Sequence, residues 1–94
     1  MRFEWDDRKN AANIKKHGMD FSQASQMFSG LYPLLAEPDL REDYAEERWC
    51  GIGRIGTKVA VVIFTHDPSF TTIRIISLRE AEAHEQNNYY SKTF

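Results

Sequence analysis

The order of apolar and polar residues divides the chain into a helical first half and a second half made of strands. Alternating apolar and charged residues over 2–5 predict a short strand. Asp6 and Asp7 follow it, and either side chain can cap the first amides of a helix. We expect this helix to end at His17, because Gly18 readily adopts the left-handed conformation that ends helices.

A second helix is predicted immediately afterwards. Asp20 and Gln23 have the spacing of a capping box, in which each side chain binds the backbone of the other residue. The helix is expected to end near 29–30. Its apolar residues recur at spacings of three and four, which predicts a buried stripe formed by Phe21, Ala24 and Phe28.

The second half of the chain reads as four strands followed by a helix. The strands are expected over 32–36, 47–54, 58–65 and 71–78, with Gly53 and Gly56 on either side of a tight turn. The third strand is apolar on both faces, which is typical of a central strand. The helix beginning at Glu80 has few apolar residues before Tyr89, so we expect it to be weakly attached to the core.

These elements predict an α+β fold. Two N-terminal helices would pack on a mainly antiparallel sheet of four to five strands, with a short helix at the C-terminus. A length of 94 residues, with 41% hydrophobic and 28% charged residues, indicates one globular domain over 1–94. No apolar run is long enough to cross a membrane or to act as a signal peptide, so we expect a cytoplasmic protein.

Charge and cysteine content limit the possible functions. The formal net charge is −2, which argues against nucleic-acid binding by bulk charge. Acidic residues are concentrated in 37–47, including Glu42 and Asp43, whereas 51–79 is mostly basic, so a positive surface can exist locally. Cys50 is the only cysteine, which excludes an internal disulfide and a cysteine zinc site and indicates a small apolar strand residue.

The first helix carries one group of candidate functional residues. Separations of three, four and seven place four polar residues in one sector of that helix, pointing near the sheet: Lys9, Asn13, Lys16 and His17. His17 is the strongest catalytic candidate among them, because imidazole transfers protons near neutral pH. The alternative is a solvated helix face whose last cations are favoured by the helix dipole.

The strands carry the other candidates, Arg48, His66, Arg74 and Arg79. Arg74 and Arg79 are five residues apart and would face opposite sides of a regular strand. They can serve one site only if a bulge intervenes or if Arg79 lies beyond the strand end. Alternatively, the arginines form surface ion pairs with nearby glutamates, and His66 is a solvent-facing loop residue.

The chain contains no nucleophile triad, phosphate loop, metal-ligand cluster or cofactor motif. Arginines, lysines and histidines on a small sheet suit RNA cleavage without a metal. A base activates the ribose 2′-hydroxyl and cations stabilise the phosphorane. The same residues also suit simple phosphate binding.

Several short motifs, in this order and spacing, resemble the BrnT toxins of bacterial type II toxin–antitoxin systems, which share the RelE-like ribonuclease fold. The resemblance spans nearly the whole chain. The motifs are Phe3-Glu4-Trp5-Asp6, Lys9, Asn13, Lys16-His17-Gly18, Phe21, Ala24, Phe28, Glu46-Glu47-Arg48, Ile52-Gly53 and Arg74-Ile75-Ile76-Ser77-Leu78-Arg79. Two positions depart from the family pattern: Leu78 replaces the usual alanine, and His66-Asp67 stand where relatives often have an acidic-basic pair.

The resemblance implies a metal-independent endoribonuclease that cleaves RNA and inhibits translation. Its motifs carry over to Lys16, His17, Arg48 and Arg79, and His66 is added as a further candidate for proton transfer. We therefore expect catalytic roles for His17, Arg48, His66 and Arg79 and RNA contacts from Lys9, Lys16 and Arg74. The implied partner is a BrnA-type antitoxin with a ribbon-helix-helix DNA-binding part. It would form a heterotetramer with the toxin and mediate all contact with operator DNA. The alternative is a noncatalytic interaction module, or an inactive relative that acts as a co-repressor with its DNA-binding partner.

Overall fold

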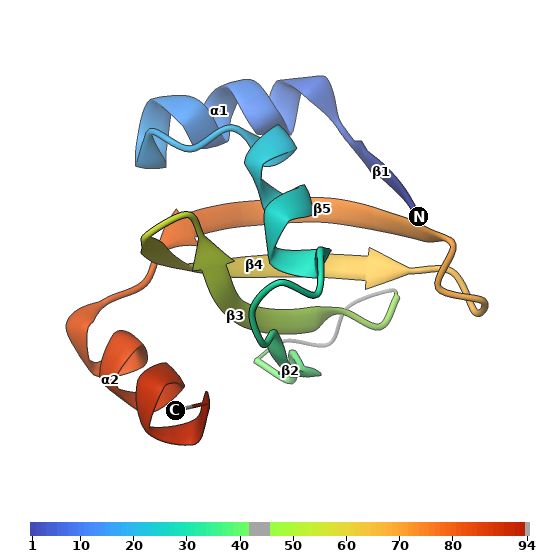
Figure 1. The fold of residues 1–94 in the computed structure, drawn as a ribbon. Helices are drawn as coiled ribbons and strands as arrows, with labels where there is room; N and C mark the ends of the chain where they lie inside the picture. The colour runs from blue at the N-terminus through green and yellow to red at the C-terminus, as the bar shows by residue number, and fades with distance from the viewer. Residues whose placement is uncertain (42–45, 94) are drawn as a thin grey trace.

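The chain folds into a five-stranded sheet with helices on both faces, as seen in a computed structural model that describes residues 1–41 and 46–93 (Figure 1). Glu42 and Asp43 of the acidic segment therefore lie outside the described residues. The elements, in chain order, are β1 (Arg2–Trp5), α1 (Asp7–His17), the 3-10 helix η1 (Phe21–Phe28), β2 (Leu35–Pro38), β3 (Trp49–Ile55), β4 (Lys58–His66), β5 (Thr72–Glu80) and α2 (Ala83–Thr93).

The strands lie in the order β1-β5-β4-β3-β2. The last four strands of the chain form an antiparallel meander, as predicted, and β1 joins its edge parallel to β5. The sheet is therefore mixed, and the α+β class predicted from the sequence is confirmed. β4 is the central strand, flanked by β3 and β5, in agreement with its continuous apolar sequence.

The predicted ends of the two N-terminal helices are confirmed, whereas the C-terminal helix begins at Ala83 rather than at Glu80, which is the last residue of β5. The Asp6 side chain accepts hydrogen bonds from the amides of Arg8 and Lys9, and Gly18 ends α1 with a φ of 70°. Asp20 and Gln23 form the expected capping box. The second helix is, however, a 3-10 helix, because the sequence pattern indicates a helix without fixing its hydrogen-bond spacing.

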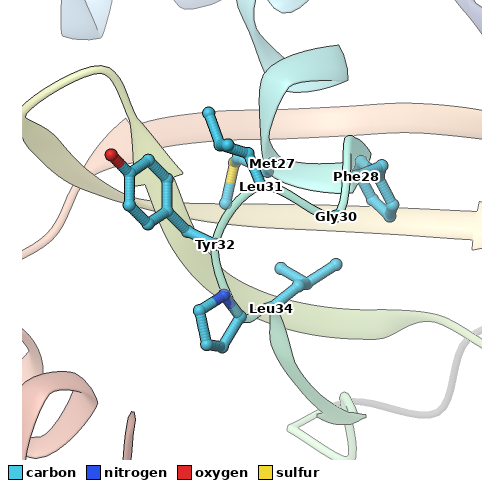
Figure 2. Close-up of a pocket in the computed structure, with 7 residues that line it drawn as sticks. Met27, Phe28, Gly30, Leu31, Tyr32 and Leu34 are labelled. Carbon is cyan, nitrogen blue, oxygen red and sulfur yellow. The ribbon is translucent and has the colours of Figure 1, made fainter. Parts of the chain in front are cut away.

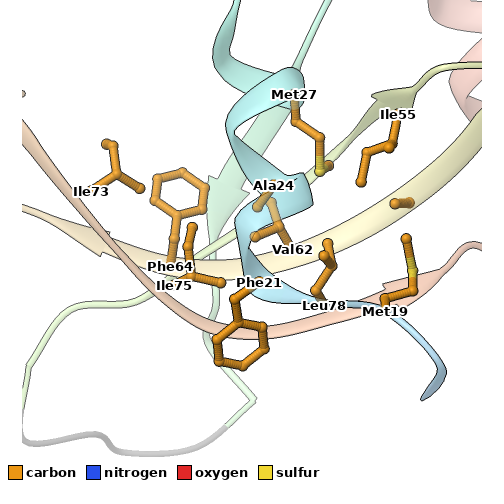
Figure 3. Close-up of a cluster of buried hydrophobic side chains, with 11 residues drawn as sticks. Met19, Phe21, Ala24, Met27, Ile55, Val62, Phe64, Ile73, Ile75 and Leu78 are labelled. Carbon is orange, nitrogen blue, oxygen red and sulfur yellow. The ribbon is translucent and has the colours of Figure 1, made fainter. Parts of the chain in front are cut away.

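The main core lies between the sheet and η1, together with Met19 from the segment that precedes η1 (Figure 3). Phe21 and Ala24 of η1 are buried in it as predicted, whereas Phe28 is only half-buried and Met27 is the third fully buried residue. The remaining buried members are Met19, Ile55, Ala60, Val62, Phe64, Ile73, Ile75 and Leu78. This face of the sheet is called the core face below.

Helix α2 covers part of the opposite face, which is called the open face below. Tyr89 is fully buried there with Val59 and Val61, and its hydroxyl donates a 2.6 Å hydrogen bond to the carbonyl of Pro33. As expected, none of the described residues of this helix belongs to the main core, but Tyr89 attaches it to a separate small cluster on the open face. One buried tyrosine anchors the helix, although its average hydrophobicity is low.

Two boundaries in the middle of the chain also differ from the prediction. The second strand begins at Leu35 rather than at Tyr32, whose ring instead lies under the guanidinium of Arg54 at 3.8 Å. The turn between β3 and β4 uses Gly56, with a φ of 60°, whereas Gly53 lies inside β3. A methyl group at Gly53 would lie 3.2 Å from the side chain of Leu34, so this glycine serves close packing rather than the turn.

Candidate functional site

A β-bulge in β5 decides how the candidate arginines are arranged. Ile63 of β4 pairs with Ser77, but the next residue, Phe64, pairs with Ile75. Ile76 is therefore an extra residue in β5. An extra residue reverses the alternation of side chains between the two faces of a strand.

The bulge places Arg74 and Arg79 on the same face of the sheet. Ile73 and Ile75 point into the core, and beyond the bulge so does Leu78, which is fully buried. The residues next to these core positions, Arg74 and Arg79, therefore face the open side together. Regular alternation over 71–78 would place Leu78 on the same face as Arg74, but the bulge breaks this alternation and Leu78 faces the core.

The two arginines occupy different rows of the open face. Arg74 pairs with Thr65 of β4, and Arg79 pairs with Val61. Thr65 and Val61 are four residues apart, which corresponds to about 13 Å along the strand.

Arg48 belongs to the same face. It directly precedes β3, and its carbonyl accepts a 2.7 Å hydrogen bond from the amide of Asp39, which extends the pairing of β2 with β3. Cys50, two residues later, packs with the buried cluster under α2. The two-residue alternation therefore places Arg48 on the open face, in the row of Thr65 and Arg74.

A pocket at one end of the sheet brings together two of the predicted site residues, His66 and Arg74. Its volume is about 370 Å³. Its lining consists of Arg2, Glu4, Glu46, Thr65, His66, Asp67, Thr72 and Arg74. Arg48 and Arg79 are not among these lining residues. The parallel pairing of β1 with β5, which puts Arg2 opposite Thr72, adds a second guanidinium.

Arg74 is only loosely engaged by protein groups. Its Nη1 lies 3.7 Å from Oε1 of Glu4, and both side chains are nearly half exposed, at 44% and 46%. An exposed ion pair of this length contributes little free energy. A phosphodiester, which carries one negative charge as the Glu4 carboxylate does, can therefore compete with Glu4 for Arg74.

His66 is the last residue of β4. It pairs with Ile73 and its ring packs near Trp49, so its side chain leaves the strand on the core-face side, whereas Arg74 lies on the open face. One of its ring nitrogens has a fixed partner. Its Nδ1 is 2.7 Å from the carbonyl oxygen of Asp67. Because a carbonyl only accepts, Nδ1 carries the hydrogen, and the neutral ring keeps a lone pair on Nε2. This tautomer leaves His66 able to take up a proton.

The Asp67 carboxylate organises the loop after β4 and is not a free acid or base. It accepts hydrogen bonds from the Thr71 hydroxyl, from the Thr72 amide at 2.9 Å and from the Ser69 hydroxyl at 3.0 Å. These bonds, led by the Thr71 hydroxyl, hold the pKa of Asp67 well below its usual range. The carboxylate stays ionised, and the loop it binds stays ordered.

Arg79 is engaged by α2. Its two terminal nitrogens donate to the two carboxylate oxygens of Glu85, at 2.7 and 2.9 Å. This pairing lowers the pKa of Glu85 to about 2 and raises the pKa of Arg79. The ion pair joins the end of β5 to the first turn of α2.

The candidates of α1 lie on the other side of the sheet, away from the arginines. Lys9, Lys16 and His17 are exposed. Asn13 is buried instead, and its amide group bonds both the carbonyl and the amide of Leu78, at 2.8 and 3.2 Å. Asn13 therefore fixes α1 to β5, and the predicted polar sector divides into one structural residue and three solvated ones.

The protein has a second cavity with different chemistry, of about 430 Å³ (Figure 2). It is lined by Met27, Phe28, Gly30, Leu31, Tyr32, Pro33 and Leu34. None of these side chains is charged at neutral pH, so this cavity offers a ligand mainly apolar contact. It does not match an anionic substrate.

Cys50 is half-buried on the open face, and burial raises the pKa of its thiol, which fits the predicted apolar role.

Across residues 1–41 and 46–93, no group of three or more His, Cys, Asp or Glu side chains is close enough to hold a metal ion. No helix in this part of the chain is long and apolar enough to cross a membrane.

Sequence reasoning missed Arg2 and Glu85. Arg2 enters the pocket through the pairing of β1 with β5, which no local pattern reveals. Glu85 does carry a signal, since it lies near the start of the predicted C-terminal helix, six residues after Arg79. An arginine near a strand end and an acidic residue in the helix that follows can pair when the connection is short.

The fold and the sequence both match known toxins. A family model described as "Ribonuclease toxin, BrnT, of type II toxin-antitoxin system" matches residues 5–85. The crystal structure of the Brucella abortus ribonuclease toxin BrnT is 30% identical and has a TM-score of 0.63. The match covers 87% of this chain and 97% of that one. No curated protein matches the chain.

These matches define the class of the protein as a toxin of a type II toxin–antitoxin system, a class in which the antitoxin is a protein. Within that class, the chain belongs to the BrnT family of ribonuclease toxins. The resemblance seen in the sequence motifs is thereby confirmed.

Proposed function

We propose that this protein is a metal-independent endoribonuclease that acts in the cytoplasm, cleaves RNA and so inhibits translation. The observation that carries the proposal is the pocket at the end of the sheet, which His66, Arg74 and Arg2 line together. A group able to take a proton and two guanidiniums suit ribose-assisted RNA cleavage, because the first can act as the base and the others can stabilise the developing charge. Each group can act without a cofactor.

The pocket supports a mechanism in which the RNA supplies its own nucleophile. Nε2 of His66 takes the proton of a ribose 2′-hydroxyl as its oxygen attacks the adjacent phosphorus. Arg74 and Arg2 neutralise the charge that builds on the phosphorane. The bond to the 5′-oxygen then breaks, and that oxygen takes a proton from water. The products are a 2′,3′-cyclic phosphate and a 5′-hydroxyl end.

The other predicted site residues take different parts in this proposal. Arg48, in the same row of the open face as Arg74, contacts a neighbouring phosphate. Arg79 is a positioning residue, because Glu85 occupies both of its terminal nitrogens and the pair holds α2 against β5. His17 and Lys16 form part of the solvated surface of α1 and lie outside the proposed RNA site.

We further infer that the neutralising partner is a BrnA-type antitoxin with a ribbon-helix-helix part. The two proteins would form a heterotetramer that contacts operator DNA only through the antitoxin. This inference, like the assignment to the RelE-like group of folds, is supported by the family membership. Two exposed leucines, Leu31 and Leu40 at 76% and 85%, are apolar contacts available to a protein partner.

Expression in bacteria tests the proposal. The informative variant is His66→Asn, because the asparagine amide can replace the Nδ1 hydrogen bond to the carbonyl of Asp67 but has no counterpart of Nε2. Lys16→Ala, on the far side of the sheet, is the matched control. We expect the wild type and the control to arrest growth and fragment RNA, and the neighbouring antitoxin gene to rescue growth. Expression of His66→Asn should neither arrest growth nor fragment RNA. Arrest by soluble His66→Asn at the wild-type level would contradict the assignment.

A further inference from the structure

The loop after β4 holds an aromatic side chain in an unusual backbone conformation. Phe70 has a φ of 58°, and it is the only residue other than glycine with a positive φ in the described part of the chain. Its side chain is 50% exposed. Glycine or asparagine adopts this conformation at lower cost, so a bulky aromatic residue here is strained.

The loop fixes the direction of the Phe70 ring without burying it. The Phe70 amide donates a 3.0 Å hydrogen bond to the carbonyl of Asp67. The Asp67 carboxylate in turn binds the amides of Thr71 and Thr72, at 2.7 and 2.9 Å. The Ser69 hydroxyl also donates to this carboxylate, at 3.0 Å, so residues on both sides of Phe70 are held by one ionised group.

Trp49, His66 and Phe70 form a column of aromatic rings, in which Trp49 is the inner member and Phe70 the outer one. The Phe70 ring stacks on the ring of His66, with centroids 3.6 Å apart and planes 19° from parallel. The indole of Trp49 lies 5.9 Å from the same imidazole and packs against the core cluster. The column leaves Phe70 partly uncovered, in direct contact with the imidazole that lines the pocket of Arg74.

An exposed ring next to guanidiniums has the chemistry that binds single-stranded nucleic acid. Unpaired bases stack on aromatic side chains, and arginines hold the backbone phosphates. Here Arg2 and Arg74 line the pocket, and His66 both lines that pocket and stacks on Phe70. His66 leaves β4 on the core-face side and Arg74 lies on the open face, so a nucleotide stacked on Phe70 would reach around the end of the sheet to place its phosphate at Arg2 and Arg74.

We propose that the exposed face of Phe70 stacks an unpaired base of the RNA and thereby sets the ribose of that nucleotide beside Nε2 of His66. The position of this subsite rests on the proposed ribonuclease function, but the stacking is a binding property and can be measured without cleavage. The substrate class is single-stranded RNA, because a base within a duplex has no free face.

The test measures the affinity of a fluorescent ten-nucleotide 2′-O-methyl RNA, whose blocked 2′-oxygen prevents cleavage by the proposed route. Phe70→Gly removes the ring and relieves the positive φ, whereas Phe70→Trp keeps an aromatic face. Base–aromatic stacking of about 1–3 kcal/mol corresponds to roughly 5- to 150-fold in affinity. We expect Phe70→Gly to lose affinity within this range and Phe70→Trp to retain it. Leu31→Ala, which removes an exposed apolar side chain elsewhere, should bind as the wild type does.

Thermal unfolding shows whether each variant is folded. We expect Phe70→Gly to melt at or above the wild-type temperature, because glycine takes this φ without strain. If it does not fold, Phe70→Asn replaces it, since asparagine also tolerates the left-handed region. A folded variant that binds the single strand as the wild type does would overturn the proposal. So would loss of antitoxin binding with unchanged RNA affinity, which would assign Phe70 to the protein partner.

The two proposals can fail separately. If Phe70→Gly weakens binding of the uncleavable RNA but the wild type cleaves no RNA, the stacking site stands and the catalytic assignment fails. If the wild type cleaves RNA and Phe70→Gly binds and cleaves normally, the stacking proposal fails alone. A duplex of the same sequence should bind more weakly than the single strand, and equal affinity would contradict base stacking.

Discussion

The ion pair between Arg79 and Glu85 should stabilise the attachment of α2, and replacing Arg79 by alanine tests this role. The pair makes two charge-assisted hydrogen bonds of 2.7 and 2.9 Å, with side chains 35% and 18% exposed. Hydrogen bonds to charged groups contribute about 1.5–3 kcal/mol, so we expect a loss of about 2 kcal/mol. Domains of this size lose roughly 0.2 kcal/mol/K at the midpoint, so Tm should fall by about 10 °C.

The effect should depend on pH in a defined direction. The pKa of Glu85 falls from 4.5 to about 2 when the chain folds. A carboxyl whose pKa is lowered on folding contributes stability that is fully present above its unfolded pKa and is lost as pH falls through its folded pKa. The difference in Tm between the wild type and Arg79→Ala should therefore be largest above about pH 5 and shrink towards pH 2.

Thermal unfolding followed by circular dichroism measures both effects, and Glu85→Gln and the double variant complete a mutant cycle. Arg74→Ala is the matched control, because its 3.7 Å exposed pair with Glu4 should contribute under about 1 kcal/mol. Equal Tm values for Arg79→Ala and the wild type at pH 7 would refute the reasoning, as would a difference that persists unchanged at pH 2. At temperatures well below its Tm, the Arg79→Ala variant should still cleave RNA, because the Arg79 side chain pairs with Glu85 of α2 and does not contact the RNA.

Three further substitutions test the packing that supports the site. Asn13→Ala leaves the buried amide and carbonyl of Leu78 without their partner and should cost about 2–4 kcal/mol, measured by urea unfolding. Tyr89→Phe removes the 2.6 Å bond to the carbonyl of Pro33 and should cost about 1 kcal/mol by the same assay, and an unchanged urea midpoint would count against the anchor. Gly51→Ala places a methyl group 3.1, 3.2 and 3.3 Å from three core side chains, so overpacking should lower stability by about 1–3 kcal/mol, and a rise in Tm would show that the core yields.

The parts of the fold that depend on local chemistry were predictable from the sequence. The ends of α1 and η1 follow from Asp6, Gly18 and the capping box of Asp20, because these residues act on backbone groups within a few positions. The apolar run of β4 likewise indicates its central place. Tyr89 was underrated, because an average over a helix hides a single residue that carries most of its burial.

The arrangement of the site depends on strand pairing, which no local pattern reports. The bulge at Ile76 puts Arg74 and Arg79 on the same face of the sheet. From the sequence we could say that a bulge would have this effect, but not that one is present. Arg2 reaches the pocket only because β1 pairs with β5, whose residues lie some seventy positions further along the chain. Hydrogen bonds to Asp67 set the loop conformation around Phe70. The positive φ of Phe70 could not be predicted, because phenylalanine rarely adopts this conformation.

Cleavage of a synthetic single-stranded RNA by the purified protein in excess EDTA tests the central claim most directly. We predict cleavage by the wild type that leaves 2′,3′-cyclic phosphate ends. The rate should fall about 10²- to 10⁴-fold in His66→Asn, the range that general base catalysis supplies, and should be unchanged in Lys16→Ala. Cleavage that requires an added metal ion, or that is undiminished in folded His66→Asn, would contradict the account.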